Sequence, residues 1–240
     1  MQQYGPCDPF PCFALSIEGV PPTVFEGILP EARKKIEGAL SKALYSSIDG
    51  DLPEQEGKEI ENLVDPLIKR FNEETGRPDG RQTDWVLRRK AALIFNNKEV
   101  LTFDIVSEEY FGGAHSIAEH TIKSFLKSDG SVVGFDTLVA PYSRSIFQSV
   151  LEVEFRRAFE IPPGSSFEDA GFTVKNGTSL PIPENIGVVD GGLLLHYNPY
   201  EIAPYSKGSF ALKVPLEPLE PLLRGGDLPG SAKKLFETTP

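Results

Sequence analysis

The segment from Asp190 to Gly208 constrains the fold of this chain more than any other stretch. It opens with the turn Asp190-Gly191-Gly192, where glycine accepts the positive φ angles that tight hairpin turns require. The short apolar run Leu193 to Asn198 then predicts a buried strand. Pro199 and Pro204 bracket the residues that follow and prevent regular structure there. We therefore expect a loop of fixed shape, since a flexible linker would be polar and loose.

The spacing of apolar residues changes along the chain from helical to alternating. Helical spacing predicts one helix from Pro30 to about Ile48 and a second from about Glu54 to Asn72, interrupted by Pro66. Alternation predicts a long hairpin with strands Trp85 to Phe95 and Val100 to Tyr110. The other expected elements are strands at Phe13–Ile17, Ile117–Leu126, Phe172–Val174, Ile186–Val189 and Ser209–Val214, and helices at Tyr142–Phe159 and Leu216–Leu223.

Helices and antiparallel strands that occur in blocks, without regular βα alternation, indicate an α+β fold with antiparallel sheets and packed helices. We expect an N-terminal subdomain at residues 1–115, built from two helices and the hairpin. A C-terminal α+β subdomain at residues 116–224 follows, and residues 225–240 are predicted to be a flexible tail. The chain of 240 residues is long enough for either one large core or two smaller ones.

The net charge of −11 argues against nucleic acid and anionic membrane surfaces as partners and favours basic ones. The run Arg88-Arg89-Lys90 is more consistent with a solvated strand face than with a binding patch in so acidic a chain. No apolar run is long enough to insert into a membrane. The sequence has no nucleophile elbow and no glycine-rich phosphate loop, so it predicts neither a catalytic residue nor a cofactor.

Cys7 and Cys12 are the only cysteines and flank a short proline-rich loop. They fit a disulfide formed in an oxidising compartment, although free thiols in a cytosolic protein remain an alternative. A zinc site would need four ligands. His115 and His120 are five residues apart, so they would face opposite sides of a strand and would miss the i, i+4 spacing of a helix. We expect no metal site.

Two motifs give the chain a resemblance to a known family. The run Tyr197-Asn198-Pro199-Tyr200-Glu201-Ile202-Ala203-Pro204-Tyr205-Ser206-Lys207-Gly208 resembles the C-terminal signature of a domain-of-unknown-function family in exported bacterial proteins. The turn Tyr110-Phe111-Gly112-Gly113-Ala114-His115 resembles a Gly-Gly-Ala-His turn of the same family. That family includes the outer part of the RsiV-type anti-sigma factor, which senses lysozyme, and the non-catalytic N-terminal region of a PdaC-type peptidoglycan deacetylase. The resemblance covers roughly residues 12 to 223.

The two motifs supply the candidate binding residues. His115 follows a glycine break in a strand, where an imidazole can face a partner, or where it can lock the bend by bonding a backbone carbonyl. Tyrosines suit protein or glycan surfaces, but Tyr200 and Tyr205 could instead cap the core. His196 is expected inside a buried strand. The full set of candidates is Tyr110, Gly112, Gly113, His115, Tyr197, Tyr200, Glu201 and Tyr205.

The resemblance implies a non-catalytic, extracytoplasmic binding or sensing domain of a bacterial envelope protein. No signal peptide is visible, so we expect that a leader has been removed, although a cytosolic start would look the same. It implies a ligand that is a protein such as lysozyme, or cell-wall glycan, and the negative charge is compatible with a basic protein. An enzyme or accessory module acting on peptidoglycan or other envelope glycans is the alternative. A structural lipoprotein domain without a small ligand is a third possibility.

Overall fold

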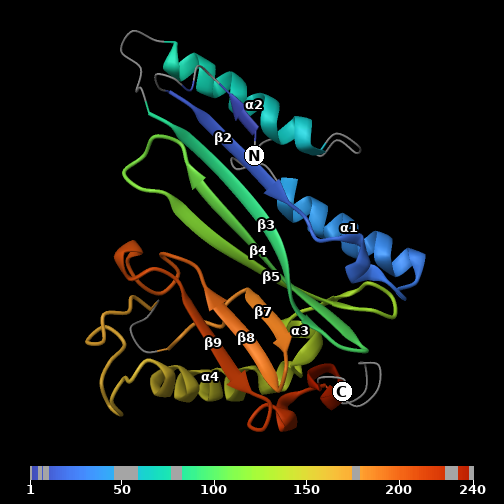
Figure 1. Ribbon diagram of the computed structural model, residues 1–240. Helices are drawn as coiled ribbons and strands as arrows, with labels where there is room; N and C mark the ends of the chain where they lie inside the picture. The colour runs from blue at the N-terminus through green and yellow to red at the C-terminus, as the bar shows by residue number, and fades with distance from the viewer. Residues whose placement is uncertain are drawn as a thin grey trace.

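A computed structural model describes residues 2–4, 7, 11–45, 59–76, 83–174, 179–224 and 232–237 (Figure 1). The chain forms two sheets flanked by helices, as the α+β prediction requires. The larger sheet has six strands whose spatial order follows the sequence: β1 (Gln2–Tyr4), β2 (Phe13–Glu18), β3 (Trp85–Asn96), β4 (Val100–Tyr110), β5 (Ile117–Leu126) and β6 (Val132–Val133). All neighbours are antiparallel except β2 and β3, which are parallel because two helices separate them in the chain.

Two long helices, α1 (Pro30–Tyr45) and α2 (Glu59–Thr75), cover one face of the six-stranded sheet (Figure 1). Ile36 and Leu40 of α1 pack against Phe103 and Phe125 of the sheet. The α2 helix contributes to a separate aromatic cluster around Trp85, and it continues through Pro66 without ending. The predicted starts and ends of these helices at residues 46–58 lie outside the described residues.

The second sheet contains β7 (Asn185–Val189), β8 (Gly192–Tyr197) and β9 (Phe210–Pro215), paired in that order and antiparallel. The helix α4 (Arg144–Ala158) covers one face of this sheet through Phe147, Leu151 and Phe155, which share a core with its strands. The remaining short elements are α3 (Phe135–Leu138) and the 3₁₀ turns η1 (Pro22–Phe25), η2 (Pro141–Ser143), η3 (Tyr205–Lys207), η4 (Glu220–Leu222) and η5 (Ala232–Phe236).

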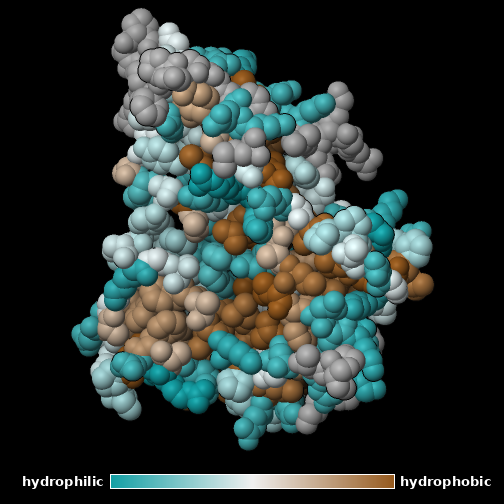
Figure 2. Space-filling view, viewed as in Figure 1, coloured by the Kyte–Doolittle hydropathy of each residue, from teal (hydrophilic) through white to brown (hydrophobic). Residues whose placement is uncertain are grey.

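The other face of the three-stranded sheet packs on one end of the six-stranded sheet, where β7 lies against β4 and β5. Gly187 permits this approach, because a Cβ there would collide with Ile122 and would lie 2.9 Å from Cγ2 of Thr102. The hydroxyl of Thr102 donates to the Val188 carbonyl at 2.6 Å, and the Val188 amide donates to Ser124 Oγ at 2.9 Å. We call this contact the sheet junction. In Figure 2, apolar residues gather over the lower half of the view, where the second sheet lies, while the described part of the upper half is mostly hydrophilic.

Several expectations need correction. The six-stranded sheet continues through the expected boundary at 115/116, because β5 pairs with β4 from Ile117 to Leu126. Residues Phe172–Val174 do not form the expected strand. Phe172 and Val174 are buried in the core beside the second sheet without pairing to it. The helix expected at Leu216–Leu223 is reduced to the η4 turn.

The C-terminal segment also differs from the flexible tail that the sequence predicted. Residues 225–231 and 238–240 lie outside the described residues. Between them, Leu235 and Phe236 are buried in the core that contains the second sheet. The Asn97 side chain lies in the turn between β3 and β4, and its two N–H groups are shared among the carbonyls of Lys234, Leu235 and Glu237 at 3.0–3.1 Å. Residues 234–237 are therefore held against the turn between β3 and β4.

The basic run on β3 is only partly the solvated face that was expected. Arg88 and Lys90 are exposed and form ion pairs with Glu108 and Glu18. Arg89 is 4% exposed, and its guanidinium bonds Leu44 O at 2.9 Å and Glu109 Oε1 at 3.1 Å. A buried guanidinium needs such partners, because an unpaired buried charge is strongly destabilising. Arg89 therefore joins α1 to the sheet.

Candidate functional site

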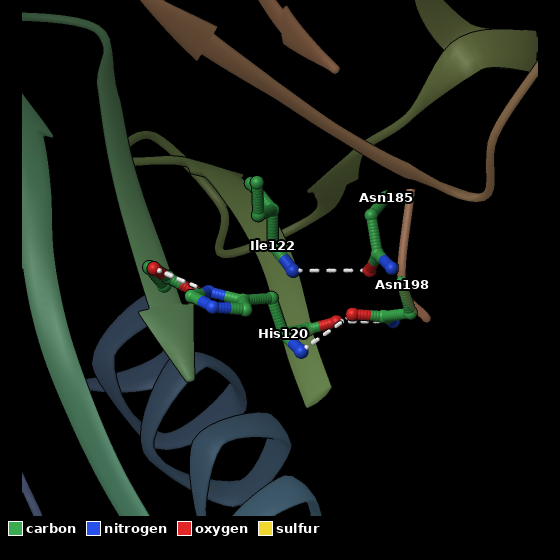
Figure 3. Close-up of polar contacts among 5 residues, drawn as sticks. His120, Ile122, Asn185 and Asn198 are labelled. Atoms are coloured by element: carbon green, nitrogen blue, oxygen red, sulfur yellow. Dashed lines mark hydrogen bonds and ion pairs between the residues drawn. The ribbon is translucent and has the colours of Figure 1, made fainter. Parts of the chain in front are cut away.

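The outer edge of β5 is covered by two asparagine side chains from the second sheet (Figure 3). Asn198, directly after β8, accepts a hydrogen bond from the His120 amide at 2.8 Å and donates to the His120 carbonyl at 3.0 Å. Asn185 accepts a bond from the Ile122 amide at 3.2 Å. The amide group of Asn198 thus pairs with the backbone as a neighbouring strand would. This pairing fixes the start of the loop 198–208.

Replacing Asn198 with alanine should lower the free energy of unfolding by about 1–2 kcal/mol, because a backbone amide and a carbonyl both lose their partner. Urea unfolding followed by circular dichroism measures the loss. Asn198→Asp can still accept from His120 N but cannot donate to its carbonyl, so we expect it to be destabilised as well. Wild-type stability in both variants would show that this pairing contributes nothing.

His115, Tyr200 and Tyr205 form one aromatic cluster, although the turn after β4 supplies the first and the loop after β8 supplies the others. The His115 and Tyr205 rings stack with centroids 3.6 Å apart, and Tyr200 lies 5.8 Å from Tyr205. The Tyr200 hydroxyl is 3.5 Å from Nε2 of His115. Both Tyr205 Oη and His115 Nδ1 bond the carbonyl of Ser116. The carbonyl bond expected of His115 is therefore present, together with an aromatic partner.

The loop presents Tyr200 to solvent in an unusual backbone conformation. Tyr200 is 61% exposed and has φ of +72°, which is uncommon for a residue other than glycine. Ile202 and Ala203, which follow closely, are buried, and the Ile202 carbonyl accepts a bond from Thr173. The loop is thus anchored at its middle while Tyr200 projects outward. Such a conformation persists only where the surrounding structure holds it, and it is often found at ligand sites.

Carboxylates lie near the same loop. Partial burial raises the pKa of the largely exposed Glu201 carboxyl, and the charges of Glu184 and Glu119 raise it further, while a backbone hydrogen bond at Asn198 opposes them. These three glutamates come from β5, the segment before β7 and the loop after β8. The negative charges repel one another, and a cation placed among them would relieve that repulsion.

A second polar group lies where the sheets meet. His120 Nδ1 is 2.9 and 3.0 Å from the two carboxylate oxygens of Asp104. The His196 ring of β8 packs against the His120 ring with centroids 4.2 Å apart. His196 is 5% exposed, and its Nε2 has no hydrogen-bond partner. Burial, then the nearby His120, lowers the pKa of His196 to about 4, while Asp104 acts in the opposite direction.

The structure brings together only some of the candidate residues. His115, Tyr200 and Tyr205 are in contact, and Glu201 follows Tyr200 on the same loop. Tyr197 does not belong to this surface, because it is fully buried and its hydroxyl donates to Pro181 O at 2.6 Å. That burial also raises the pKa of the Tyr197 phenol.

The glycine turn acts through its backbone. Gly112 has φ of +83°, and a Cβ there would lie 2.7 Å from Thr83 Oγ1, so only glycine fits. Gly113 follows in the same turn, and Tyr110 ends β4 opposite Val86. These residues shape the turn that carries His115. In the N-terminal arm, Cys7 and Cys12 form a disulfide with Cα atoms 4.5 Å apart.

Sequence reasoning missed the residues that connect the two sheets, namely Asp104, His120, Asn185 and Asn198. Asn198 was inside the motif, but its partner His120 is 78 positions away. His120 was considered only as a zinc ligand. Among the described residues no group of three or more histidine, cysteine, aspartate or glutamate side chains could hold a metal ion. In that same part of the chain, no helix is long and apolar enough to cross a bilayer.

The fold and the site define an α+β domain in which two sheets jointly present an exposed aromatic cluster. Residues 135–217, from α3 to just beyond β9, match the model of a family described as a protein of unknown function (DUF3298). That range contains Tyr200, Glu201 and Tyr205. His115 lies outside it. No curated protein matches this chain.

Two solved structures of proteins from the same family are similar to this chain. A member from Bacteroides fragilis NCTC 9343 has 18% identity and a TM-score of 0.67, with 84% of this chain and 82% of that chain covered. A family protein from Pseudomonas aeruginosa PAO1 has 16% identity and a TM-score of 0.66, with 95% and 89% covered. Identities this low establish a common fold and leave the ligand open.

Proposed function

We propose that this chain is a non-catalytic binding or sensing domain of a bacterial envelope protein, and that its ligand is a basic protein of the lysozyme type. The observation that carries the proposal is the aromatic cluster, whose outermost member, Tyr200, is 61% exposed on a loop anchored by buried neighbours. Tyrosine offers a large contact area at a low cost in side-chain entropy, and it is enriched among residues that dominate protein interfaces. A fixed, exposed tyrosine beside a stacked His115–Tyr205 pair suits this role.

The charge of the surface supports a basic ligand. The chain carries a net charge of −11, and the pKa of Glu201 is raised by partial burial and then by the negative charges of Glu184 and Glu119. A lysine or arginine from a ligand would relieve that repulsion on binding. Complementary charge of this kind accelerates association and selects the partner.

A location outside the cytoplasm is part of the proposal. The Cys7–Cys12 disulfide supports it, because such bonds persist in oxidising compartments. The resemblance of the two motifs to the lysozyme-sensing RsiV-type family points the same way. A periplasmic or cell-surface domain would meet cationic lysozyme directly.

Calorimetric titration with a cationic lysozyme tests the proposal. We expect binding at low salt that weakens as salt is added, since the attraction between net charges is screened. Tyr200→Ala should weaken the affinity about tenfold or more, as expected for an interface residue worth about 1.4 kcal/mol or more. Glu201→Gln should reduce the dependence of the affinity on salt.

Tyr142 provides a matched control, because it is an 83% exposed tyrosine at the start of the α4 region. Tyr142→Ala should bind the lysozyme as the wild type does. If titration with lysozyme at low salt gives no heat of binding, and lysozyme competes with no other ligand, then lysozyme is not the ligand. Retention on purified peptidoglycan without lysozyme would instead identify cell-wall glycan as the ligand.

One observation favours an enzyme or accessory module acting on envelope glycans as the second candidate. The raised pKa of Glu201 beside Glu184 and Glu119 is the kind of environment that tunes a general acid. Incubation with peptidoglycan decides between the two functions, because an enzyme would release soluble fragments or acetate. Glu201→Gln would abolish that release.

A further inference from the structure

We propose that the histidine end of the sheet junction is an acid-sensitive contact, which opens when the buried His196 ring takes up a proton. The two rings face each other at 4.2 Å, one from each sheet. His120 is held from behind by Asp104 at 2.9 Å. In the open form, the two sheets have separated at this end while each sheet stays folded.

The surroundings of His196 do not stabilise the protonated form of its ring. Its side chain is 5% exposed, and Nε2 has no hydrogen-bond partner. Protonation would therefore create a buried cation with an unsatisfied N–H group, which is costly in a protein interior. Separation of the sheets would expose the His196 ring to water and remove this cost.

The charged groups around this pair do not compensate for the added charge. Asp104 on β4 is the anion in contact, and it is already bonded to His120. The strands paired with β8 contribute uncharged residues opposite His196, namely Asn185 on β7 and Ala211 on β9. On β3, Lys90 forms its ion pair with Glu18. The remaining acidic groups, Glu119, Glu184 and Glu201, lie exposed at the rim.

The contacts across the junction determine which part can open. At the histidine end the sheets are joined by the bonds of Asn198 to His120 and of Asn185 to Ile122. At the other end, Thr102 and Ser124 bond the backbone of Val188, and the continuous apolar core includes Phe95, Val100 and Leu126. Opening should therefore begin at the histidine end and leave the Val188 end closed.

The direction of the pH effect follows from His196. Its pKa is about 4 in the closed form and should return to the ordinary value near 6.5 when the ring is hydrated. The open form thus binds more protons between these values and is favoured as the pH falls. For one group with these two pKa values, the ratio of open to closed molecules rises about 30-fold between pH 7.5 and pH 5.

Amide hydrogen exchange followed by NMR tests the inference without any ligand, so its outcome is independent of the proposed function. After correction for the intrinsic pH dependence of exchange, protection of the His120 and Ile122 amides should fall about 30-fold from pH 7.5 to pH 5. The Val188 amide, bonded to Ser124 Oγ, serves as the internal control and should keep its protection. Equal protection of His120 and Ile122 at both pH values would overturn the inference, and so would an equal fall at Val188.

Two variants sharpen the test. His196→Leu removes the titrating group and places an apolar side chain at this buried position, and the fall in protection should disappear. His115→Gln removes an exposed histidine that is not at the junction, and the fall should remain. If His196→Leu does not fold, the wild-type protein still tests the inference. The loss of amide protection must then follow the same pH dependence as the NMR signals of the His196 ring.

Discussion

Asn97→Ala is expected to lower the free energy of unfolding by about 3 kcal/mol, the largest effect of any single change considered for this chain. The Asn97 side chain is 4% exposed and donates to three backbone carbonyls of the C-terminal segment. Its oxygen also accepts bonds from the amides of Glu99 and Val100 at 2.9 and 2.8 Å. Alanine would leave the buried carbonyl of Leu235 and the buried amide of Val100 without this partner, and each such group costs about 1–3 kcal/mol.

Urea denaturation measures this change, and the neighbouring residue supplies the control. Asn96 is exposed, and its side chain accepts one bond from Lys127. Asn96→Ala should therefore stay within about 0.5 kcal/mol of the wild type. A loss of less than about 0.5 kcal/mol for Asn97→Ala as well would mean that the C-terminal segment does not depend on this side chain.

Gly187→Ala is expected to cost about 1–3 kcal/mol, because a methyl group would have no room at the sheet junction. Its Cβ would collide with Ile122 and would lie 2.9 Å from the methyl carbon of Thr102. Those neighbours are buried between the sheets and cannot move into solvent. The sheets would have to separate slightly, which would also strain the Thr102 and Ser124 bonds to Val188.

Thermal unfolding provides the measurement, since 1 kcal/mol corresponds to about 2–4 °C for a chain of this size. Gly19→Ala is the control, because a Cβ there would meet no atom within 4 Å. The control should retain the wild-type melting temperature. An unchanged melting temperature for Gly187→Ala would contradict the close approach of β7 to β4 and β5.

Local patterns in the sequence predicted the elements but not how the two sheets meet. The hairpin of β3 and β4 is recognisable because two long runs rich in apolar residues, alternating most clearly at the start of β3, flank a short polar turn. Burial of Arg89 was also readable from that pattern, since Arg89 has the same parity as Leu87 and Ala91. Arg88 and Lys90 on either side of Arg89 made the whole run look like a solvated face.

The candidate site was only partly predictable, for a reason that is also physical. The turn at Gly112 and the proline loop have local signatures, so His115, Tyr200 and Tyr205 could be selected before the structure was known. Their mutual contact requires the loop after β8 to lie beside the turn after β4, and the bonds between Asn198 and His120, which are 78 positions apart, join these two parts of the chain. Tyr197 was wrongly placed on the binding surface, because strand parity alone does not show which face α4 covers.

The coverage of β5 by Asn185 and Asn198 has a consequence for the behaviour of the protein in concentrated solution. An uncovered strand edge presents free amides and carbonyls, which can recruit a strand from another molecule and start aggregation. Here the amides of His120 and Ile122 and the carbonyl of His120 are already engaged by side chains of the same chain. Neighbouring copies therefore find no open template along this stretch, and the domain can expose its tyrosines without self-association through β5.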